Sequence, residues 1–252
     1  MTKTIDLNAD MGESFGAWSI GDGVDADIMP LISSANIAAG FHAGDPTTMQ
    51  HTLRLASQYG VGVGVHPGFD DLVGFGRRAI AAPAVELVND AIYQLGALRE
   101  LARLEGIKMH HFKLHGALFM HAAKDADFAE QLCSALAKVA PELPIYCLAG
   151  SAFDKAAKAF GLPRVNEFYA DRDYNDEGSI VFVRKVQRLD PEKVAQKVLR
   201  ACEQGTVESV SGKIVPVTFQ SVCIHSDTPG ALALVKAVRN TLDKAGIKVA
   251  AP

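Results

Sequence analysis

Short strand-like segments alternate with amphipathic helices along the whole chain, and this alternation limits the folds that the chain can adopt. Seven segments have the length and the apolar or β-branched content of strands. They are Ile5–Ala9, Ser34–Ala38, Val61–Val65, Met109–Leu114, Ile145–Leu148, Val165–Tyr169 and Ser221–Ile224, and an additional short strand could lie at Ile180–Val183. Because strands separated by helices form βαβ units, the sequence predicts an α/β fold with a parallel sheet.

Start and stop signals delimit four of the predicted helices. Asp45-Pro46, Asp190-Pro191 and Thr228-Pro229 each place a capping side chain before a proline, which is typical of a helix start. A fourth helix has its apolar stripe between Val88 and Leu98. These helices are long enough to cross over between neighbouring parallel strands.

The chain is long enough to bury one large core and shows no linker that would divide it. Its 252 residues are 48% hydrophobic, so residues 1–252 are predicted to form a single domain. The net charge of −4 offers no basic surface to nucleic acid. The sequence has no segment like a signal peptide, no apolar run that could span a membrane, and four scattered cysteines. We expect a cytoplasmic protein with buried free thiols in apolar surroundings and with no nucleic-acid or membrane partner.

Side chains that can carry out chemistry follow almost every predicted strand. They are Asp10 and Glu13 after the first strand, His42 after the second, His66 after the third, Lys113 and His115 at the fourth, Asp171 and Arg172 after the sixth, and His225 and Asp227 after the last. Ligands of parallel α/β folds bind at the carboxyl ends of the strands. We therefore expect these side chains to converge on one polar site.

Four of the eight histidines lie between residues 110 and 121, but they are not equivalent. With the period of a strand, His111, Lys113 and His115 share one face, and Phe112 and Leu114 pack outward under the helices. Only Lys113 and His115 stand where the predicted strand ends. The other three histidines of this segment are interpreted as structural or surface residues: His110, His111 and His121.

Two kinds of chemistry fit the predicted site. Four of its residues could ligate a divalent metal ion that activates water: Asp10, His42, His66 and His115. Without a metal, the same residues could act as general acid and base, with Lys113 and Arg172 stabilising an oxyanion. Both routes lead to the hydrolysis of a carbonyl compound.

Other residues and motifs bear on which kinds of active site the chain can have. Arg77 and Arg78 follow a glycine-rich turn and either clamp an anionic group or carry solvated loop charges. A serine nucleophile is poorly supported, since no serine lies in a Gly-x-Ser-x-Gly turn. Gly212-Lys213 lacks the upstream glycine of a phosphate-binding loop, so the chain shows no nucleotide site of its own. Cys223 lies inside a strand and is interpreted as buried rather than nucleophilic.

Ordered motifs along nearly the whole chain resemble the 5-oxoprolinase A-subunit family, also called the LamB/YcsF lactam-utilisation family. The segments that carry the resemblance are 6–13, 33–37, 40–46, 66–68, 74–78, 93–98, Lys113 with 115–118, 170–172 with Tyr174, and 223–225 with Asp227. What the resemblance implies is an irregular (β/α) barrel of about seven parallel strands, like that of glycoside hydrolases and deacetylases.

The resemblance also implies an activity: the ATP-dependent opening of 5-oxo-L-proline to L-glutamate, in a complex with two partner subunits, B and C. ATP would be a co-substrate handled together with these subunits. Asp10 or His115 would then be the base for the attacking water, and Lys113, Arg77 and Arg172 would neutralise phosphate and carboxylate groups. The predicted catalytic residues are Asp10, His42, His66, Lys113, His115, Asp171, Arg172 and His225, and the predicted substrate-binding residues are Glu13, Arg77, Arg78 and Asp227.

The chain departs from the family pattern at Ala39, Leu114, Phe119 and Ser226. Activity on another lactam or cyclic amide is therefore one alternative. A second is a metal-dependent deacetylase of the same barrel fold. A third is a non-catalytic role, in which the chain binds a lactam or holds the partners together.

Overall fold

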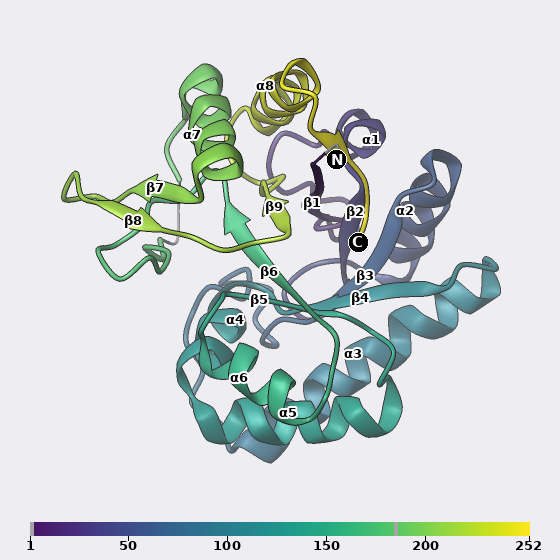
Figure 1. Ribbon diagram of the computed structural model, residues 1–252. Coiled ribbons are helices and arrows are strands. Elements are labelled where there is room, and N and C mark those ends of the chain that lie inside the picture. Colours follow the sequence, from purple (N-terminus) through teal and green to yellow (C-terminus); the bar gives the residue numbers. More distant parts are fainter. Residues whose placement is uncertain (1–2, 184–185) are drawn as a thin grey trace.

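Seven parallel strands form a closed barrel in a computed structural model, which describes residues 3–183 and 186–252 (Figure 1). Neighbouring strands pair in the order β1, β2, β3, β4, β5, β6 and β9, and β9 pairs back with β1. The strands are β1 Thr4–Met11, β2 Ser34–Ala38, β3 Gly62–His66, β4 Met109–Lys113, β5 Ile145–Cys147, β6 Arg164–Tyr169 and β9 Ser221–Cys223. The predicted strands and the irregular (β/α) barrel are confirmed.

Three further strands in the described residues lie outside the barrel and were not predicted. The strand β10, Lys248–Val249, pairs with the start of β1, and β7, Thr206–Glu208, forms an antiparallel hairpin with β8, Ile214–Pro216. The additional strand proposed for residues 180–183 is wrong. Ile180 makes only a single antiparallel bridge to Tyr174, because the chain between them folds into a tight turn.

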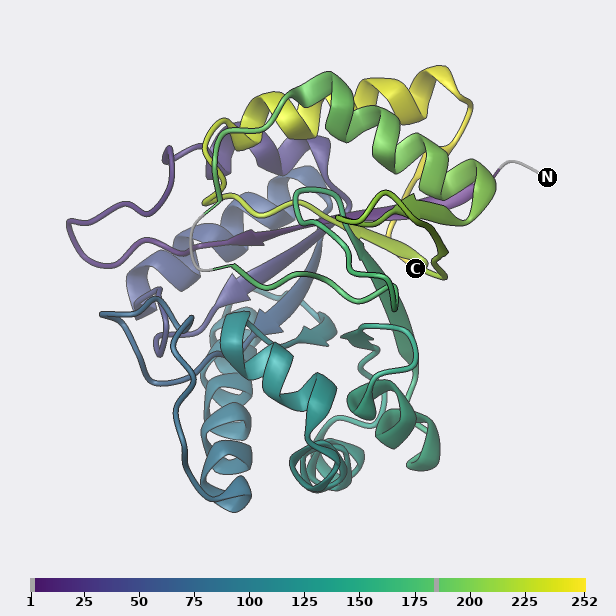
Figure 2. The ribbon, with the colours of Figure 1, turned by 90° about the vertical axis from the view of Figure 1, so that its left-hand side faces the viewer.

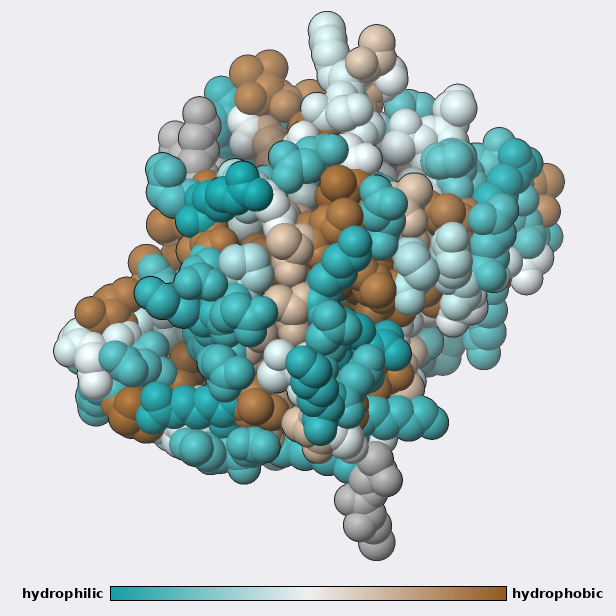
Figure 3. Space-filling model, turned by 90° about the horizontal axis from the view of Figure 1, so that it is seen from above, coloured by the Kyte–Doolittle hydropathy of each residue, from teal (hydrophilic) through white to brown (hydrophobic). Residues whose placement is uncertain are grey.

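Helices cover the outside of the barrel (Figure 1). They are α1 Asp25–Ile28, a 3₁₀ turn Met29–Leu31, α2 Pro46–Tyr59, α3 Ala84–Leu104, α4 Gly116–Lys124, α5 Ala126–Val139, α6 Ala152–Ala159, α7 Pro191–Gln204 and α8 Ala231–Lys244. The predicted starts at Pro46 and Pro191 are confirmed, with the carboxylates of Asp45 and Asp190 accepting backbone N–H groups. The outer face over α7 and α8 mixes hydrophilic and hydrophobic residues (Figure 3).

The last helix starts later than the sequence predicts. Thr228 does not cap it, because the Thr228 hydroxyl donates to the carboxylate of Asp171 at 2.6 Å. Instead α8 begins at Ala231, after Gly230 in the left-handed conformation with φ of 80°. Glycine adopts this conformation without a steric cost.

Alternation along the strands separates an apolar layer from a polar lumen. On β1, Leu7 and Ala9 pack outward in the hydrophobic core. The inward side chains are Asp6, Asn8 and Asp10, and all three are buried. The lumen of this barrel is therefore filled with hydrogen-bonded polar groups.

The two ends of the barrel differ because all seven strands run in the same direction. The loops that follow β1 and β3 extend from one end, opposite the end at which β1 begins (Figure 2). We call this end, where the strands finish, the mouth, and the opposite end the base. None of the helices in the described ranges combines the length and the apolar character that a membrane crossing requires.

Candidate active site

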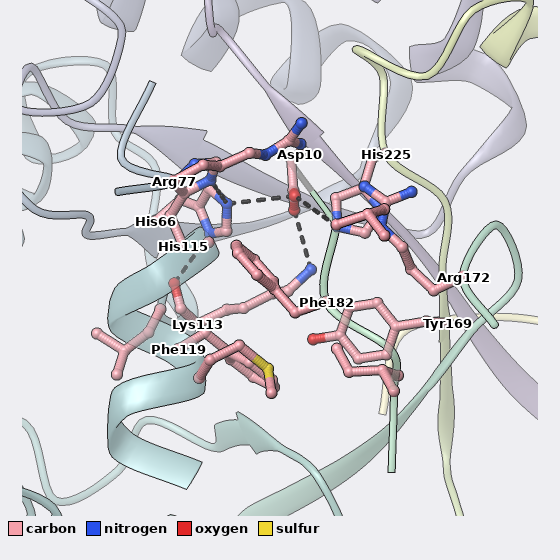
Figure 4. Close-up of a pocket in the computed structure, with 15 residues that line it drawn as sticks. Asp10, His66, Arg77, Lys113, His115, Phe119, Tyr169, Arg172, Phe182 and His225 are labelled. Carbon is pink, nitrogen blue, oxygen red and sulfur yellow. Dashed lines mark hydrogen bonds and ion pairs between the residues drawn. The ribbon is translucent and has the colours of Figure 1, made fainter. Parts of the chain in front are cut away.

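A polar cavity lies at the mouth of the barrel (Figure 4). Seven of the twelve predicted site residues line it: Asp10, His66, Arg77, Lys113, His115, Arg172 and His225. Apolar and aromatic side chains complete its wall: Leu114, Phe119, Met120, Tyr169, Ile180, Phe182 and Val183. The structure thus brings together side chains that the sequence places at separate strand ends.

The ammonium group of Lys113 lies at the centre of the site, surrounded by acceptors. Its Nζ donates to Asp10 Oδ1 at 2.9 Å, to Asn8 Oδ1 at 3.2 Å and to Cys223 Sγ at 3.0 Å, and Glu167 Oε1 lies 3.3 Å away. Burial favours the neutral amine, but Asp10, Cys223 and Glu167 raise the pKa of Lys113 well above its usual value. Lys113 is therefore a buried cation.

The prediction that Cys223 lies in apolar surroundings is wrong. All four cysteines are free and buried, as expected. Cys223, however, does not lie among apolar groups only, since its sulfur accepts from Lys113. Burial raises the pKa of its thiol well above the usual value, although Lys113 opposes this rise. Cys223 is therefore a neutral thiol beside the central cation.

Asp10 faces the cavity as an ionised carboxylate. Its Oδ1 accepts from Asn36 Nδ2 at 2.8 Å and from Lys113, while its Oδ2 lies 3.3 Å from His66 Nε2 and 3.7 Å from His225 Nε2. Burial opposes its ionisation, but His66 and Lys113 hold the pKa of Asp10 well below its usual value. Two imidazoles therefore approach one carboxylate oxygen.

His225 is oriented by a carboxylate behind it. Its Nδ1 lies 2.9 Å from Asp171 Oδ1, and Thr228 and Arg172 bind the other oxygen of Asp171. Burial opposes ionisation of Asp171, but His225 and Arg172 keep its pKa well below the usual value. Because an ionised carboxylate only accepts, Nδ1 of His225 donates to Asp171, and its Nε2 faces Asp10 and the cavity.

Glu13, His42, His66 and His115 form a second, fully buried group, which we call the histidine cluster. Glu13 Oε1 lies 3.3 Å from His42 Nε2, 3.3 Å from His115 Nδ1 and 3.9 Å from His66 Nε2. Burial lowers the pKa of His42 to about 3 and also lowers that of His66. One donor atom from each side chain lies within 4.8 Å of the others, a separation that one metal ion can bridge.

The carboxylate that joins these three histidines is Glu13, whereas the sequence suggested Asp10. Asp10 lies next to the cluster, with its Oδ2 3.3 Å from His66 Nε2. Glu13 and His42 lie behind His66 and His115, the two rings that border the cavity. The Nδ1 atom of His42 has no protein hydrogen-bond partner among the described residues.

The two neighbouring arginines point to different places. Arg77 lines the cavity and forms a two-bond ion pair with Asp227, at 2.8 Å for each contact. Arg78 instead pairs with Asp71, and 52% of its side chain is exposed. Asp227 therefore orients Arg77 at the rim, while Arg78 lies away from the cavity.

Residues on β6 belong to the site although the sequence analysis did not assign them. Tyr169 lines the cavity, donates to Glu167 Oε2 at 3.0 Å and stacks on His225 with ring centroids 5.6 Å apart. Glu167 and Tyr169 have a sequence signal, because they alternate with apolar residues and therefore share the inward face of the strand. Phe182 projects into the cavity from a long loop and has no such signal (Figure 4).

His111 lies in the lumen below the site. Its Nε2 is 2.6 Å from Asn36 Oδ1, and the amide of Asn36 in turn donates to Asp10. The ring fits there because Gly64 lies opposite it, where an added Cβ would be 2.1 Å from His111 Nε2. His111 thus positions Asn36 and through it Asp10.

Comparisons with known proteins agree with one another. The LamB/YcsF family model matches residues 5–252. A 5-oxoprolinase A subunit of Pseudomonas aeruginosa is 60% identical over 98% of this chain and 98% of its own length. The 5-oxoprolinase A subunit of Brevibacillus brevis is 44% identical over 99% of this chain and 98% of its own.

Solved structures show the same fold. The crystal structure of the lactam utilization protein from Thermus thermophilus has a TM-score of 0.92 and 41% identity, covering 99% of this chain and 100% of that chain. A family 4 carbohydrate esterase from Streptomyces lividans has a TM-score of 0.50 and 11% identity, covering 98% of this chain and 91% of that chain. The second likeness concerns the barrel fold alone, which is the glycoside hydrolase/deacetylase type.

Proposed function

The chain belongs to the LamB/YcsF lactam-utilisation family, and from this membership we propose that it is one component of a multisubunit 5-oxoprolinase. The proposed reaction opens the lactam ring of 5-oxo-L-proline to give L-glutamate, with ATP as co-substrate and with two partner subunits, B and C. The names of the relatives support the substrate class and the role as one subunit of several.

One observation carries the proposal: the Asp171-oriented ring of His225 and the ionised Asp10 lie 3.7 Å apart in the wall of a cavity that also contains positive charge. A lactam carbonyl is a poor electrophile, and phosphorylation of its oxygen by ATP would activate the ring carbon. Water then attacks that carbon and loses a proton, the ring C–N bond breaks to give the amine of glutamate and an acyl phosphate, and a second water releases inorganic phosphate. His225 and Asp10 supply proton acceptors at the place where the first water would lie.

The geometry favours His225 and Asp10 over His115 as the base. Nε2 of His115 lies 2.8 Å from the carbonyl oxygen of Phe75, and its Nδ1 faces Glu13 and His66. Both nitrogens of His115 are thus engaged inside the protein. In His225, Nδ1 is engaged with Asp171, while Nε2 borders the cavity with Asp10 Oδ2 3.7 Å away and can accept a proton from a water there.

Three cations match the anionic groups of the reaction. Lys113 lies next to Asp10, while Arg77 and Arg172 stand on opposite sides of the cavity (Figure 4). Guanidinium groups bind carboxylates and phosphates through paired hydrogen bonds. The substrate carboxylate and the transferred phosphate would be bound by these groups, and the carbon atoms of the ring would pack on Phe119 and Tyr169.

Reconstitution of the complex tests the proposal. The purified chain, mixed with subunits B and C, 5-oxo-L-proline and ATP, should release L-glutamate, ADP and inorganic phosphate. His225→Gln should lower turnover by about 10²–10⁴-fold, the usual contribution of a positioned acid or base. His121→Gln, a change of the same type outside the cavity, should leave it unchanged. Glutamate release no faster than with B and C alone would refute the proposal.

The histidine cluster favours a second candidate, a metal-dependent deacetylase or cyclic-amide hydrolase that acts on another substrate. A non-catalytic lactam-binding subunit is the third. Release of acetate from N-acetyl compounds without ATP would favour the second candidate. Turnover at nearly the wild-type rate by a complex containing Lys113→Ala would favour the third.

A further inference from the structure

We propose that Glu13, His66 and His115 bind one divalent transition-metal ion of the zinc type, with an open coordination position toward Asp10 and the cavity. Two histidines and one glutamate are a known ligand set of catalytic zinc sites, in which a fourth position stays open. The proposal concerns metal binding itself and holds whether or not the chain acts on a lactam.

Backbone contacts determine which ring nitrogens carry protons. His66 Nδ1 lies 3.0 Å from the carbonyl oxygen of Lys113, and His115 Nε2 lies 2.8 Å from that of Phe75. A carbonyl oxygen only accepts hydrogen bonds, so these two nitrogens carry N–H groups. The lone pairs of His66 Nε2 and His115 Nδ1 therefore point at each other across 3.0 Å.

Two lone pairs at this distance repel each other unless a cation binds both of them. A carboxylate oxygen adds a third acceptor, since Glu13 Oε1 lies 3.3 Å from His115 Nδ1 and 3.9 Å from His66 Nε2. A fully buried imidazolium could satisfy one pair of these atoms, at a high desolvation cost. A metal ion satisfies all three acceptors at once.

The spacing of the three atoms suits a zinc-sized ion. Bonds of about 2.0–2.2 Å in tetrahedral geometry place ligand atoms about 3.3 Å apart. The observed separations of 3.0, 3.3 and 3.9 Å bracket that value. Two imidazoles and one carboxylate are also the donors that borderline metals such as Zn²⁺ prefer over Mg²⁺ or Ca²⁺.

The surrounding backbone holds these ligands in place. Phe75, whose carbonyl fixes His115, has φ of 52° and is the one non-glycine residue with positive φ among the described residues. Such a conformation costs free energy in a residue with a Cβ atom and is retained where surrounding structure enforces it. Carbonyl groups that bind the outer nitrogen of ligating histidines are a regular feature of metal sites.

His42 supports the site without being a ligand. Its ring stacks on His115, with centroids 3.7 Å apart and planes only 5° from parallel, so an ion in the plane of His115 lies out of the plane of His42. Nε2 of His42 lies 3.3 Å from Glu13 Oε1 and can donate to it. His42 is therefore a positioning residue that holds the carboxylate of Glu13.

Asp10, Cys223 and His225 form another group with metal-ligating atoms, but a cation already occupies it. Lys113 Nζ lies 2.9 Å from Asp10 Oδ1 and 3.0 Å from Cys223 Sγ. An additional divalent ion beside this ammonium group would be repelled. The histidine cluster is thus the favoured of the two groups, and His66 and His115 give it access to the cavity.

Metal binding is tested directly with the full chain. Protein freed of metal by a chelator is titrated with Co²⁺, and visible absorption and metal content per chain are measured. Wild-type protein should bind one equivalent with the absorption of a low-symmetry nitrogen–oxygen site. Glu13→Ala, His66→Ala and His115→Ala should each weaken binding by more than about 100-fold, and His42→Ala by about 10–100-fold.

Two matched controls and a folding check complete the experiment. His121→Ala removes a histidine outside the cluster, and His225→Ala removes one from the other group, so both variants should bind Co²⁺ like wild type. Circular dichroism identifies any variant that fails to fold, and for such a variant Glu13→Gln replaces Glu13→Ala. Failure of the folded wild type to bind Co²⁺ or Zn²⁺, or binding that survives all three ligand substitutions, overturns the proposal.

Discussion

The base and the mouth of the barrel lumen are both filled with buried polar side chains, but these side chains are paired in different ways. At the base, the two carboxylate oxygens of Asp6 accept hydrogen bonds from four hydroxyl groups, those of Ser33, Ser34, Tyr146 and Ser221. At the mouth, acceptors face one another, and cations and imidazoles border an open cavity.

This difference separates a structural region from a reactive one. A buried polar network in which donors and acceptors match in number rigidifies the fold. Converging lone pairs and like charges cost stability, and they are concentrated where ligands or reacting groups are bound. We infer that the base holds the barrel together and that the mouth carries out its chemistry.

Asp10 and Asp6 lie on the same face of β1, one in each region, and provide the strongest test. Asp10→Asn removes the charge at the mouth and should lower turnover of the reconstituted complex by about 10²–10⁴-fold. Its free energy of unfolding should also fall, by about 3–5 kcal/mol or less, because the buried Lys113 keeps only Glu167 as an acidic neighbour. Steady-state glutamate release and urea denaturation measure the two effects. If turnover of the Asp10→Asn complex were unchanged, the mouth would not be the reactive region of the barrel.

Asp6→Ala changes a carboxylate outside the cavity, so its main effect should be on stability. It leaves four hydroxyl donors without their acceptor, so the free energy of unfolding should fall by about 3 kcal/mol or more. Asp243→Ala breaks an exposed pair with Arg239 on α8 and should cost less than about 0.5 kcal/mol. Equal urea midpoints for the two variants would contradict the structural role of the base.

Asp25 tests whether a buried charge also costs stability at the rim of the mouth. Its Oδ2 accepts from the backbone N–H of Gly12 at 2.7 Å, and burial raises its pKa to about 6. Because this pKa lies above the unfolded value of 3.8, the folded chain binds the proton more tightly. The resulting stabilisation is full below pH 3.8 and is lost as the pH rises through 6.

Asp25→Asn keeps an acceptor for Gly12 but removes the charge. Thermal unfolding should therefore occur at a higher temperature than in wild type at pH 8, by about 2–4 °C for each kcal/mol gained. At pH 4, where the folded wild type is already protonated at this position, the gain should be much smaller. A shift of the same size at both pH values would show that the charge is not the cause.

Arg78→Ala should have the smallest effect. Its guanidinium group pairs with Asp71 away from the cavity, so turnover should stay within about 2-fold of wild type. Arg77→Ala is the matched variant, since Arg77 lines the cavity, and it should raise KM for the anionic substrate. A larger loss of turnover from Arg78→Ala than from Arg77→Ala would place the anion site elsewhere.

The sequence by itself determined the elements of the fold and the set of residues from which the site is built. Strand and helix periods are local properties, so the seven barrel strands and the helix starts at Pro46 and Pro191 could be predicted. The rule that parallel strands end at one face of the sheet placed the polar residues together. The order of the short sequence motifs along the chain indicated the family.

Tertiary structure alone decided which of these side chains meet. Glu13 rather than Asp10 joins the histidines, Arg77 rather than Arg78 reaches the cavity, and Thr228 binds Asp171 instead of capping α8. Such contacts depend on the closure of the barrel and on loop conformations, such as the positive φ of Phe75. Neither is encoded in the local periodicity of the chain, because both arise from contacts between residues far apart in the sequence.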